Sequence, residues 1–599
     1  MEIELREIDR HFARFIRREA LEAPPWLEMV VALTSAVVGG GDICLELAAL
    51  SGEKFWCNET EITLPSRDDL ADGLRRTQVV ATKGEYRPLV LDDGRLYLYR
   101  YWRYEQELSR IIREKATAVA GEVNETLLAA GIARLFLDTG DEKVDWQQVA
   151  AAAAVRQRFC VISGGPGTGK TSTVVKIIAL LLEQAQGTPL RIALAAPTGK
   201  AAARLKGSIR TMKENLVCDE ELLQLIPTEV VTIHRLLGSR GGSVRFTHGA
   251  DNTLAYDVVI IDEASMVALP LMAKLAVALK QEARLILLGD RDQLASVEAG
   301  AVLGDICGRG RNEPFSPEFA GYVARMTGKQ FPAQQSTAPL PPLTDSLIVL
   351  KKNYRFSAAG GIGLVGRAVN EGDGIQAMTL LRNDAYHDLV WRDVPPPEEL
   401  KKALAPTVIQ GYRAYLTAGS PAEALVRFEE FRILCALRQG PYGVTGLNRV
   451  VEEILAEAGL IDPRNRWYKG RPIMISANDY TLKLFNGDVG LVFPDQEAGG
   501  APRLFVQSPE GIIRKIAPVR LPAHETVYAM TIHKSQGSEF SQLLILLPGQ
   551  TSELLTRELI YTGVTRARDK AMLWGDEALF KATVARRVER KSGLSAILW

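Results

Sequence analysis

The sequence predicts an α/β protein with two domains built on parallel sheets, a small N-terminal domain and a small inserted β-barrel. From about residue 116 to 305, apolar strand-like runs alternate with helical stretches, and a second alternating region begins at residue 344. Such alternation indicates parallel sheets with helices on both faces. Between residues 460 and 522, short runs such as RPIMIS, DVGLVF and RLFVQS interrupt the second region. These short runs are typical of a small barrel.

Length and composition favour a multidomain globular protein. The chain has 599 residues, which exceeds one hydrophobic core, and its hydrophobic (47%) and charged (24%) fractions are ordinary. Because 72 basic residues balance 72 acidic ones, any contact with nucleic acid must come from a local groove. The charged N-terminus MEIELREIDRHFARFIRREA is unlike a signal peptide, and no apolar run is long enough to span a membrane. We therefore expect a cytoplasmic protein.

The predicted domain boundaries follow these patterns. We expect an N-terminal domain at residues 1–115, in which one helical face carries apolar side chains, and a first sheet domain at 116–343. The second sheet domain covers 344–459 and 523–599, and the barrel covers 460–522. Residues 240–255 leave room for a small hairpin within the first sheet domain.

A phosphate-binding loop is the clearest chemical motif. The stretch SGGPGTGKTSTVV lies between the apolar run CVI and the helical run VVKIIALLLEQA, which is the context that a P-loop requires. Glycines let successive N–H groups surround an anion, and the helix adds its positive N-terminal end. Lys170 would neutralise the β and γ phosphates of ATP, and Thr171 would bind Mg²⁺. A plain Gly-rich turn is the structural alternative. The predicted cradle is Gly164, Gly165, Pro166, Gly167, Thr168, Gly169, Lys170, Thr171 and Ser172.

Two acids and an amide follow other strands of the first sheet domain. In VVIIDEAS, Asp262 would hold Mg²⁺ and Glu263 would act as general base on the attacking water. Two acids at a helix start could also serve only as caps. In GDRDQL, Gln293 could contact both the γ phosphate and a mobile element, because an amide donates and accepts hydrogen bonds without charge.

Two arginines lie far along the chain, in LKKNYRF and LIYTGVTRARDK. Arginine stabilises the charge that develops on a transferred phosphoryl group. If Arg355 and Arg566 come from the second sheet domain, ATP on the first domain would draw the two domains together and hydrolysis would release them. This is the stroke of a motor.

Candidate contacts to the nucleic-acid track occur on both sheet domains. Hydroxyl, lysine and arginine side chains are typical donors to phosphate oxygens. The basic run 198–213 could be a solvated helix face, and a single TIH usually ends a strand, but TIH occurs once in each domain. The candidates are Thr198, Lys200, Arg204, Thr232, His234, Thr531, His533 and Lys534.

Taken in order, these motifs resemble the series of superfamily 1 helicases, and the RecD type in particular. The series is GGPGTGKT, APTGKAAARL, TIHRLLG, IIDEAS, GDRDQL, KKNYRF, TIHKSQGSEF and YTGVTRAR, and the resemblance covers nearly the whole chain. It implies two RecA-like domains, an SH3-like barrel and an ATP-dependent 5′-3′ single-stranded DNA translocase and helicase. It also implies action beside RecB and RecC subunits in double-strand break repair by recombination, with the N-terminal domain docked on RecC. The hairpin at 240–255 would be a reduced strand-separating pin.

The resemblance implies further site residues. Gln147 or Gln148 would contact the adenine edge and Tyr354 would stack on its ring, with the choice between the glutamines open. In the GSEF segment, Gly537 and Glu539 would lie at the nucleotide, and Glu539 would reach the ribose or the γ-phosphate region. Asn486, in NDYTLKLFNGDVG, would contact DNA.

Two other functions compete with a RecD-type subunit. One is a chiefly structural subunit whose ATP site regulates assembly. The other is a freestanding helicase of the same type, or a motor with its own nuclease. No carboxylate and lysine cluster stands out beyond the motor motifs, so the sequence assigns no nuclease site to this chain.

Overall fold

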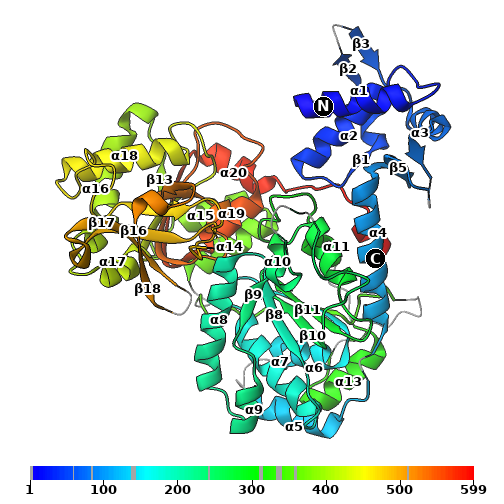
Figure 1. The fold of residues 1–599 in the computed structure, drawn as a ribbon, viewed down its shortest axis with the longest axis horizontal. Helices are drawn as coiled ribbons and strands as arrows, with labels where there is room; N and C mark the ends of the chain where they lie inside the picture. The colour runs from blue at the N-terminus through cyan, green and yellow to red at the C-terminus, as the bar shows by residue number, and fades with distance from the viewer. Residues whose placement is uncertain are drawn as a thin grey trace.

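The computed structural model places the elements in three bodies. It describes residues 5–57, 60–82, 85–119, 121–136, 144–240, 243, 245–308, 315–331, 333, 340–356, 360–479, 481–508 and 511–599. In Figure 1 the N-terminal domain lies at the upper right, the first α/β domain below it and the second at the left. Among the described residues, no helix has the length and apolar character needed to cross a lipid bilayer.

The N-terminal domain packs two helices on a four-stranded sheet of order β1-β6-β5-β4. Its core is a separate hydrophobic cluster, formed mainly by α1, α2 and the sheet. α4 then leads into the first α/β domain. The elements are α1 (Glu7–Glu19), α2 (Leu27–Gly40), β1 (Cys44–Glu46), β2 (Lys54–Cys57), β3 (Thr60–Thr63), α3 (Arg67–Arg76), β4 (Val80–Ala81), β5 (Leu89–Asp92), β6 (Arg95–Leu98) and α4 (Tyr99–Thr117).

The first α/β domain contains a six-stranded sheet of order β12-β7-β11-β10-β8-β9, in which every pairing is parallel. Its strands are continuously apolar because hydrophobic clusters cover both faces. The elements are α5 (Glu125–Leu135), α6 (Trp146–Arg156), β7 (Phe159–Ser163), α7 (Lys170–Gln184), β8 (Ile192–Ala196), α8 (Gly199–Glu214), α9 (Glu220–Leu225), β9 (Val230–Thr232), α10 (Ile233–Leu236), β10 (Val258–Ile261), α11 (Leu269–Val277), β11 (Arg284–Gly289), α12 (Val302–Ile306), α13 (Pro317–Thr327) and β12 (Leu347–Val349).

The second α/β domain contains a five-stranded parallel sheet of order β13-β22-β21-β14-β20. Hydrophobic clusters again cover both faces. The two sheets confirm the predicted α/β class. The elements are α14 (Gly361–Glu371), α15 (Gly374–Leu381), β13 (Leu389–Asp393), α16 (Pro397–Leu416), α17 (Pro421–Phe428), β14 (Phe431–Cys435), α18 (Val444–Glu457), β20 (Ala529–Thr531), β21 (Phe540–Leu546), α19 (Arg557–Val564), β22 (Ala567–Gly575) and α20 (Glu577–Ala585).

A five-stranded antiparallel sheet is inserted between β14 and β20 of the second sheet. Its order is β18-β17-β16-β15-β19. A small hydrophobic cluster of its own covers one face. The strands are β15 (Pro472–Ile475), β16 (Val489–Asp495), β17 (Ala501–Gln507), β18 (Ile513–Ile516) and β19 (His524–Thr526).

The sheet pairings move the limits that the sequence suggested. The first sheet extends past residue 343, because β12 pairs with β7, the strand that leads into the P-loop. The chain leaves the domain only after this strand. β19 pairs with β15, so the inserted sheet continues past residue 522. The C-terminal tail also leaves the second domain instead of ending there. In Figure 1 it runs from α20 across to α4, where the C-terminus is marked.

Polar contacts fasten this tail between the N-terminal domain and the first α/β domain. Ile43 N–H donates to the Lys591 carbonyl at 2.8 Å, and Lys591 N–H donates to Asp42 Oδ1 at 2.9 Å. The buried Glu105 carboxylate accepts from Gly593 N–H at 3.0 Å. Beyond it, α21 (Leu594–Leu598) packs on α4 and α12, and Trp599 Nε1 donates to the Ile306 carbonyl.

Leu598→Ala is expected to destabilise the protein by about 2–5 kcal/mol, because Leu598 is fully buried and its removal leaves a cavity. Thermal unfolding of the full chain measures the change. Leu554→Ala is the matched control, since Leu554 is 51% exposed. Equal melting temperatures for the two variants would show that the tail is not docked.

Candidate nucleotide and DNA site

The P-loop connects β7 to α7 at the edge of the first sheet that faces the second domain. Gly167 and Gly169 have φ angles of 82° and 80°, which side chains rarely adopt. A Cβ on Gly169 would lie 2.4 Å from Gln147 Nε2, and one on Gly167 would lie 2.4 Å from Arg355 Cβ. Both glycines are therefore required by backbone conformation and by the close approach of neighbouring segments.

Lys170 is the first residue of α7 and points back into the loop. Its ammonium donates to the carbonyls of Gly164 and Gly165, the latter at 3.1 Å. Burial lowers the pKa of Lys170, and the nearby Asp290, Glu263 and Asp262 carboxylates oppose that shift. The lysine therefore lies among acids at the end of the P-loop, where it can exchange loop carbonyls for phosphate oxygens.

Asp262 and Glu263 follow β10, the neighbour of β11 in the sheet. Glu263 N–H donates to Asp262 Oδ1 at 2.9 Å, and Glu263 adopts a left-handed φ of 51°. Strained backbone of this kind concentrates at functional sites. Burial, with the Glu263 charge next, raises the pKa of Asp262 to about 6. A half-buried carboxylate suits Mg²⁺, which needs few protein ligands because it keeps several waters.

The segment after β12 lies directly on the P-loop. Asn353 Nδ2 donates to the Pro166 carbonyl and Tyr354 N–H donates to the Gly167 carbonyl, both at 2.7 Å. Arg355 therefore comes from the connection that leaves the first sheet, and not from the second domain as the sequence suggested. The physical reason is the pairing of β12 with β7, which delivers the chain to the P-loop.

The two glutamines at the start of α6 have different environments. Gln147 Nε2 donates to the Thr168 carbonyl at 3.1 Å, so its amide lies on the P-loop. Gln148 is buried in the interior of the domain. Tyr354, which is 54% exposed, has its ring 3.7 Å from the position of a Cβ on Gly169. Gln147 and Tyr354 thus flank the same turn.

A glutamate of the second domain joins two arginines of the first. Glu539 Oε1 accepts from Arg355 Nη2 at 2.6 Å and is also paired with Arg204. Burial, together with the charges of Arg204, Arg566 and Arg568, lowers the pKa of Arg355 to about 10. Arg355 Nη1 is buried and has no hydrogen-bond partner in the described part of the chain. Gly537, two residues before Glu539, lies against Ala201 of α8. This concentration of positive charge suits an anion at the domain boundary.

Arg566 crosses the boundary in the other direction. It follows α19 of the second domain, is buried, and donates from Nη2 to Gln293 Oε1 of the first domain at 2.7 Å. Its other contacts are the carbonyls of Thr562 and Ser538. Gln293 of the first domain therefore contacts the second domain directly, and its contact with the γ phosphate stays a prediction.

Contacts that sequence reasoning missed surround Gln293. Tyr561 Oη donates to Asp290 Oδ2 at 2.9 Å, and Leu294 N–H donates to Thr562 Oγ1 at 3.0 Å. Gln536 Nε2 donates to the Leu294 carbonyl at 3.0 Å. All of them lie inside or beside quoted motifs, so the only available signal was adjacency to a residue already assigned.

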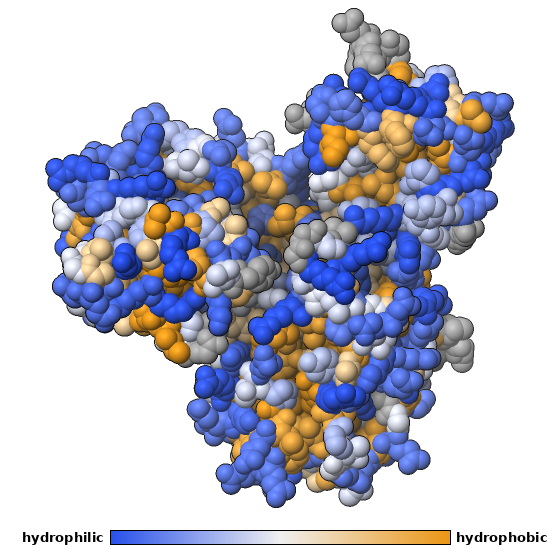
Figure 2. All heavy atoms as spheres, viewed as in Figure 1, coloured by the Kyte–Doolittle hydropathy of each residue, from blue (hydrophilic) through white to orange (hydrophobic). Residues whose placement is uncertain are grey.

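Some DNA candidates of the two domains come together. The N-terminus of α8 faces the inserted sheet: a Cβ on Gly199 would lie 3.4 Å from Phe485, next to Asn486. Lys534 Nζ donates to Asn486 Oδ1 at 2.9 Å. Burial lowers the pKa of Lys200, which follows Gly199. Figure 2 shows the surface hollowed where the two α/β domains meet.

The threonines among the candidates also have structural roles. Thr198, Thr232 and Thr531 each accept a backbone N–H three residues later through Oγ1. A hydroxyl that accepts one hydrogen bond can still donate its own hydrogen to a phosphate. These threonines shape the turns and remain suitable DNA contacts.

The two TIH histidines have different surroundings. Burial lowers the pKa of both His234 and His533. The His234 ring lies 5.7 Å from the ring of Phe246 in the 240–255 region, and Phe246 forms an isolated β-bridge with Ser239 just before that region. Residues 241, 242 and 244 of that predicted hairpin lie outside the described residues.

Comparison with known proteins gives a consistent family. Residues 2–97 match the model "RecBCD enzyme subunit RecD, N-terminal domain", residues 147–299 an AAA domain and residues 526–574 a UvrD-like helicase C-terminal domain. RecBCD enzyme subunit RecD of Mycobacterium tuberculosis is 38% identical over 98% of this chain and 93% of its own length. The Haemophilus influenzae RecD subunit is 36% identical over 85% of this chain and 81% of its own. The RecD2 DNA helicase of Deinococcus radiodurans is 30% identical over 84% of this chain, but only 58% of its own length is covered.

Near-complete coverage of the RecD subunits, the N-terminal RecD match and the helicase motifs agree along the whole length. The chain belongs to the RecD family, the superfamily 1 helicase subunits of RecBCD enzymes.

Proposed function

We propose that this chain is an ATP-driven 5′-3′ translocase and helicase on single-stranded DNA, working with RecB and RecC subunits in recombinational repair of double-strand breaks. The observation that carries the proposal is the hydrogen bond between Arg566 of the second domain and Gln293 of the first, beside a P-loop against which Arg355 packs. A nucleotide at Lys170 would lie between parts that can move relative to one another.

The catalytic roles follow from position and chemistry. Lys170 binds the β and γ phosphates, and Glu263 takes the proton of the attacking water. Arg355 and Arg566 stabilise charge on the transferred phosphoryl group, and Gln293 holds the γ-phosphate side of the site to the second domain. The unpartnered Nη1 of Arg355 supports this role, because a buried guanidinium nitrogen needs an acceptor. Mg²⁺, held by Thr171 and Asp262, neutralises phosphate charge when bound.

The remaining nucleotide contacts are assigned by location. The backbone of residues 164–169, with Ser172 in the first turn of α7, cradles the phosphates. Gln147 contacts the adenine edge and Tyr354 stacks on the ring, since both flank Gly169. Gln148 is not assigned, because it is buried. Glu539, with Gly537 before it, orders Arg355 and Arg204 beside the ribose or γ-phosphate region.

The proposed path of the single-stranded DNA lies across both α/β domains. Thr198, Lys200, Arg204, Thr232 and His234 belong to the first domain, and Thr531, His533 and Lys534 to the second, with Asn486 on the inserted sheet beside Lys534. A strand bound to both groups is moved when the domains close and part. Because the donors contact phosphates, base identity should matter little.

Lys200→Gln is expected to weaken single-stranded DNA binding equally for all base compositions. The slope of log K against log salt should decrease by about 0.7, the value for one neutralised phosphate on a single strand. Fluorescence anisotropy over a salt series measures it. Arg210→Gln is the control, since Arg210 is on the same helix about 15 Å further along. Identical slopes for both variants would show that Lys200 does not contact a DNA phosphate.

The partner and domain assignments are also proposals. The N-terminal domain docks on RecC, and the 240–255 region is a reduced strand-separating pin. We also propose that the inserted antiparallel sheet closes as an SH3-like barrel and that the protein is cytoplasmic. The match of residues 2–97 to the N-terminal domain of RecBCD enzyme subunit RecD supports a complex subunit over a freestanding helicase. No nuclease activity is assigned to this chain.

A translocation assay tests the proposal. The full chain is bound to single strands of increasing length that carry a fluorophore at the 3′ or the 5′ end, and ATP is added. We expect the 3′ signal to arrive with a delay that grows with length, and Lys170→Gln to give no such signal. A signal that does not depend on strand length would favour the alternative of a subunit whose ATP site regulates assembly. Arrival at the 5′ end would show that translocation runs 3′-5′.

A further inference from the structure

Residues 290–294 form a loop of the first domain that makes several hydrogen bonds to the second domain. The partners all come from residues 561–566: Tyr561 is hydrogen-bonded to Asp290, Thr562 to Leu294 and Arg566 to Gln293. Arg566 is also the arginine proposed to stabilise charge on the transferred phosphoryl group. The Tyr561 hydroxyl, which lies against the P-loop, has no such role.

The hydroxyl of Tyr561 lies between the P-loop and Asp290. A Cβ on Gly165 would lie 2.8 Å from this oxygen, so the hydroxyl rests against the loop. Its ring is buried in the second-domain core, where it lies against Gly366 of α14. The tyrosine is thus anchored in one domain with its polar end in the other.

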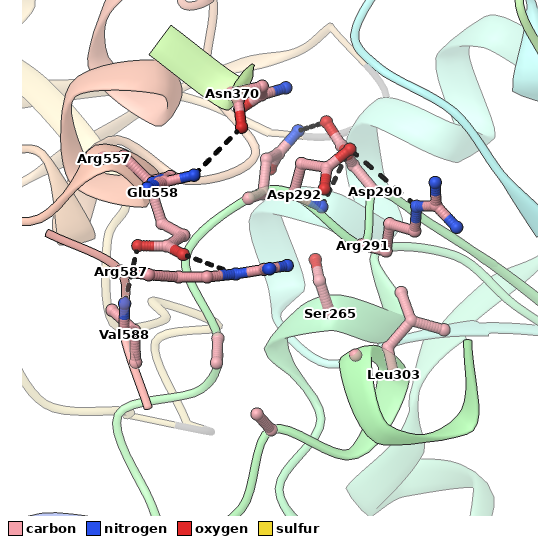
Figure 3. A pocket seen from close by; sticks show the side chains of 14 residues that line it. Ser265, Asp290, Arg291, Asp292, Leu303, Asn370, Arg557, Glu558, Arg587 and Val588 are labelled. Atoms are coloured by element: carbon pink, nitrogen blue, oxygen red, sulfur yellow. Dashed lines mark hydrogen bonds and ion pairs between the residues drawn. The ribbon is translucent and has the colours of Figure 1, made fainter. Parts of the chain in front are cut away.

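Asp290 collects bonds from both domains. Oδ2 accepts from Tyr561 and, at 3.2 Å, from Gln293 Nε2, while Oδ1 accepts from Asp292 N–H at 3.0 Å. Burial raises the pKa of Asp290 to about 6, and the Lys170 charge opposes that shift. Figure 3 shows Asp290 at the edge of a polar interdomain pocket whose facing wall carries Arg557, Glu558 and Arg587.

The Lys170 ammonium connects this contact to the nucleotide. Lys170 donates to the Gly165 carbonyl, and Gly165 is the residue against which the Tyr561 hydroxyl rests. When Lys170 turns from the loop carbonyls to phosphate oxygens, both the charge that Asp290 experiences and the position of Gly165 change. Tyr561 contacts both Asp290 and Gly165, so a change at either residue reaches the second domain directly.

We propose that Tyr561 is a positioning residue for ATP hydrolysis: its hydroxyl, bonded to Asp290 and resting on Gly165, sets the second domain and Arg566 according to the state of the P-loop. This inference rests on the proposed ATPase function. It predicts that loss of the hydroxyl impairs placement of Arg566 at the moment of reaction and leaves ATP binding intact.

Tyr561→Phe removes one oxygen and keeps the ring. In the full chain with single-stranded DNA, kcat for ATP hydrolysis should fall about tenfold or more, the effect of losing one hydrogen bond to a charged group, while KM for ATP stays within about twofold. Tyr412→Phe is the matched control. Its hydroxyl donates to the Tyr528 carbonyl in the core of the second domain, so it should lower the melting temperature without changing the kinetics.

A double-mutant cycle with Asp290→Asn separates this contact from a general loss of structure. If the two side chains act through one bond, the double variant is no slower than the slower single variant. Should Tyr561→Phe fold poorly, Asp290→Asn alters the same bond from the other domain and must show the same split between kcat and KM. An unchanged kcat, a rise in KM alone, or additive losses would each overturn the inference. An inactive wild-type chain would instead refute the proposed ATPase.

Discussion

Lys170→Gln should abolish ATP hydrolysis stimulated by single-stranded DNA, with a loss of at least about 10²–10³ in kcat. Glutamine keeps approximately the length of the side chain but has no charge to stabilise the β and γ phosphates, and electrostatic stabilisation of this kind is usually the largest catalytic contribution. Initial rates of phosphate release with saturating DNA measure the effect.

Lys176→Gln provides the control for that experiment. Lys176 lies on the same helix, but its ammonium is over the Phe136 ring at 4.3 Å, away from the P-loop. It should keep near-normal hydrolysis. If Lys170→Gln hydrolysed ATP as fast as Lys176→Gln, the nucleotide site would have to be elsewhere.

Arg566→Lys should lower kcat about 10³-fold. Lysine keeps the charge, but it is a single point donor and cannot reproduce the fork that contacts Gln293 and two backbone carbonyls at once. An arginine at a phosphoryl group contributes about 10³–10⁵ in kcat, which sets the expected size.

The matched control is Arg449→Lys, in the same domain but on the exposed surface of α18. Steady-state rates with and without DNA should be normal for this variant. If Arg566→Lys were equally active, the contact with Gln293 would be structural only, and the second domain would contribute no charge to the reaction.

The sequence predicted the motifs better than the path between them. Alternating apolar runs specified both parallel sheets, because a strand buried on two faces must be apolar throughout. No comparable pattern marks β12, which has only three residues and pairs at the edge of the first sheet. Arg355 was therefore assigned to the wrong side of the domain boundary, and its place at the nucleotide stays a prediction.

Side-chain partners were the least predictable part of the site. Gln147 and Gln148 are neighbours in sequence, and only the direction of α6 sends one to the P-loop and the other into the core. Tyr561 is 271 residues from Asp290, so no local pattern could pair them. The docking of the C-terminal tail depends in the same way on Glu105, a buried acid in an ordinary amphipathic helix.

The central claim is that ATP draws the two α/β domains together, and energy transfer between dyes on each domain tests it most directly. Dyes are placed at Leu225→Cys of the first domain and Val426→Cys of the second, which are 61% and 63% exposed, in a Cys218→Ser background. In the chain with Lys170 intact, a non-hydrolysable ATP analogue should give a new, single distance between the two dyes. In Lys170→Gln the distance between the dyes should not change. The same distribution of distances with and without the nucleotide in the active chain would contradict the account.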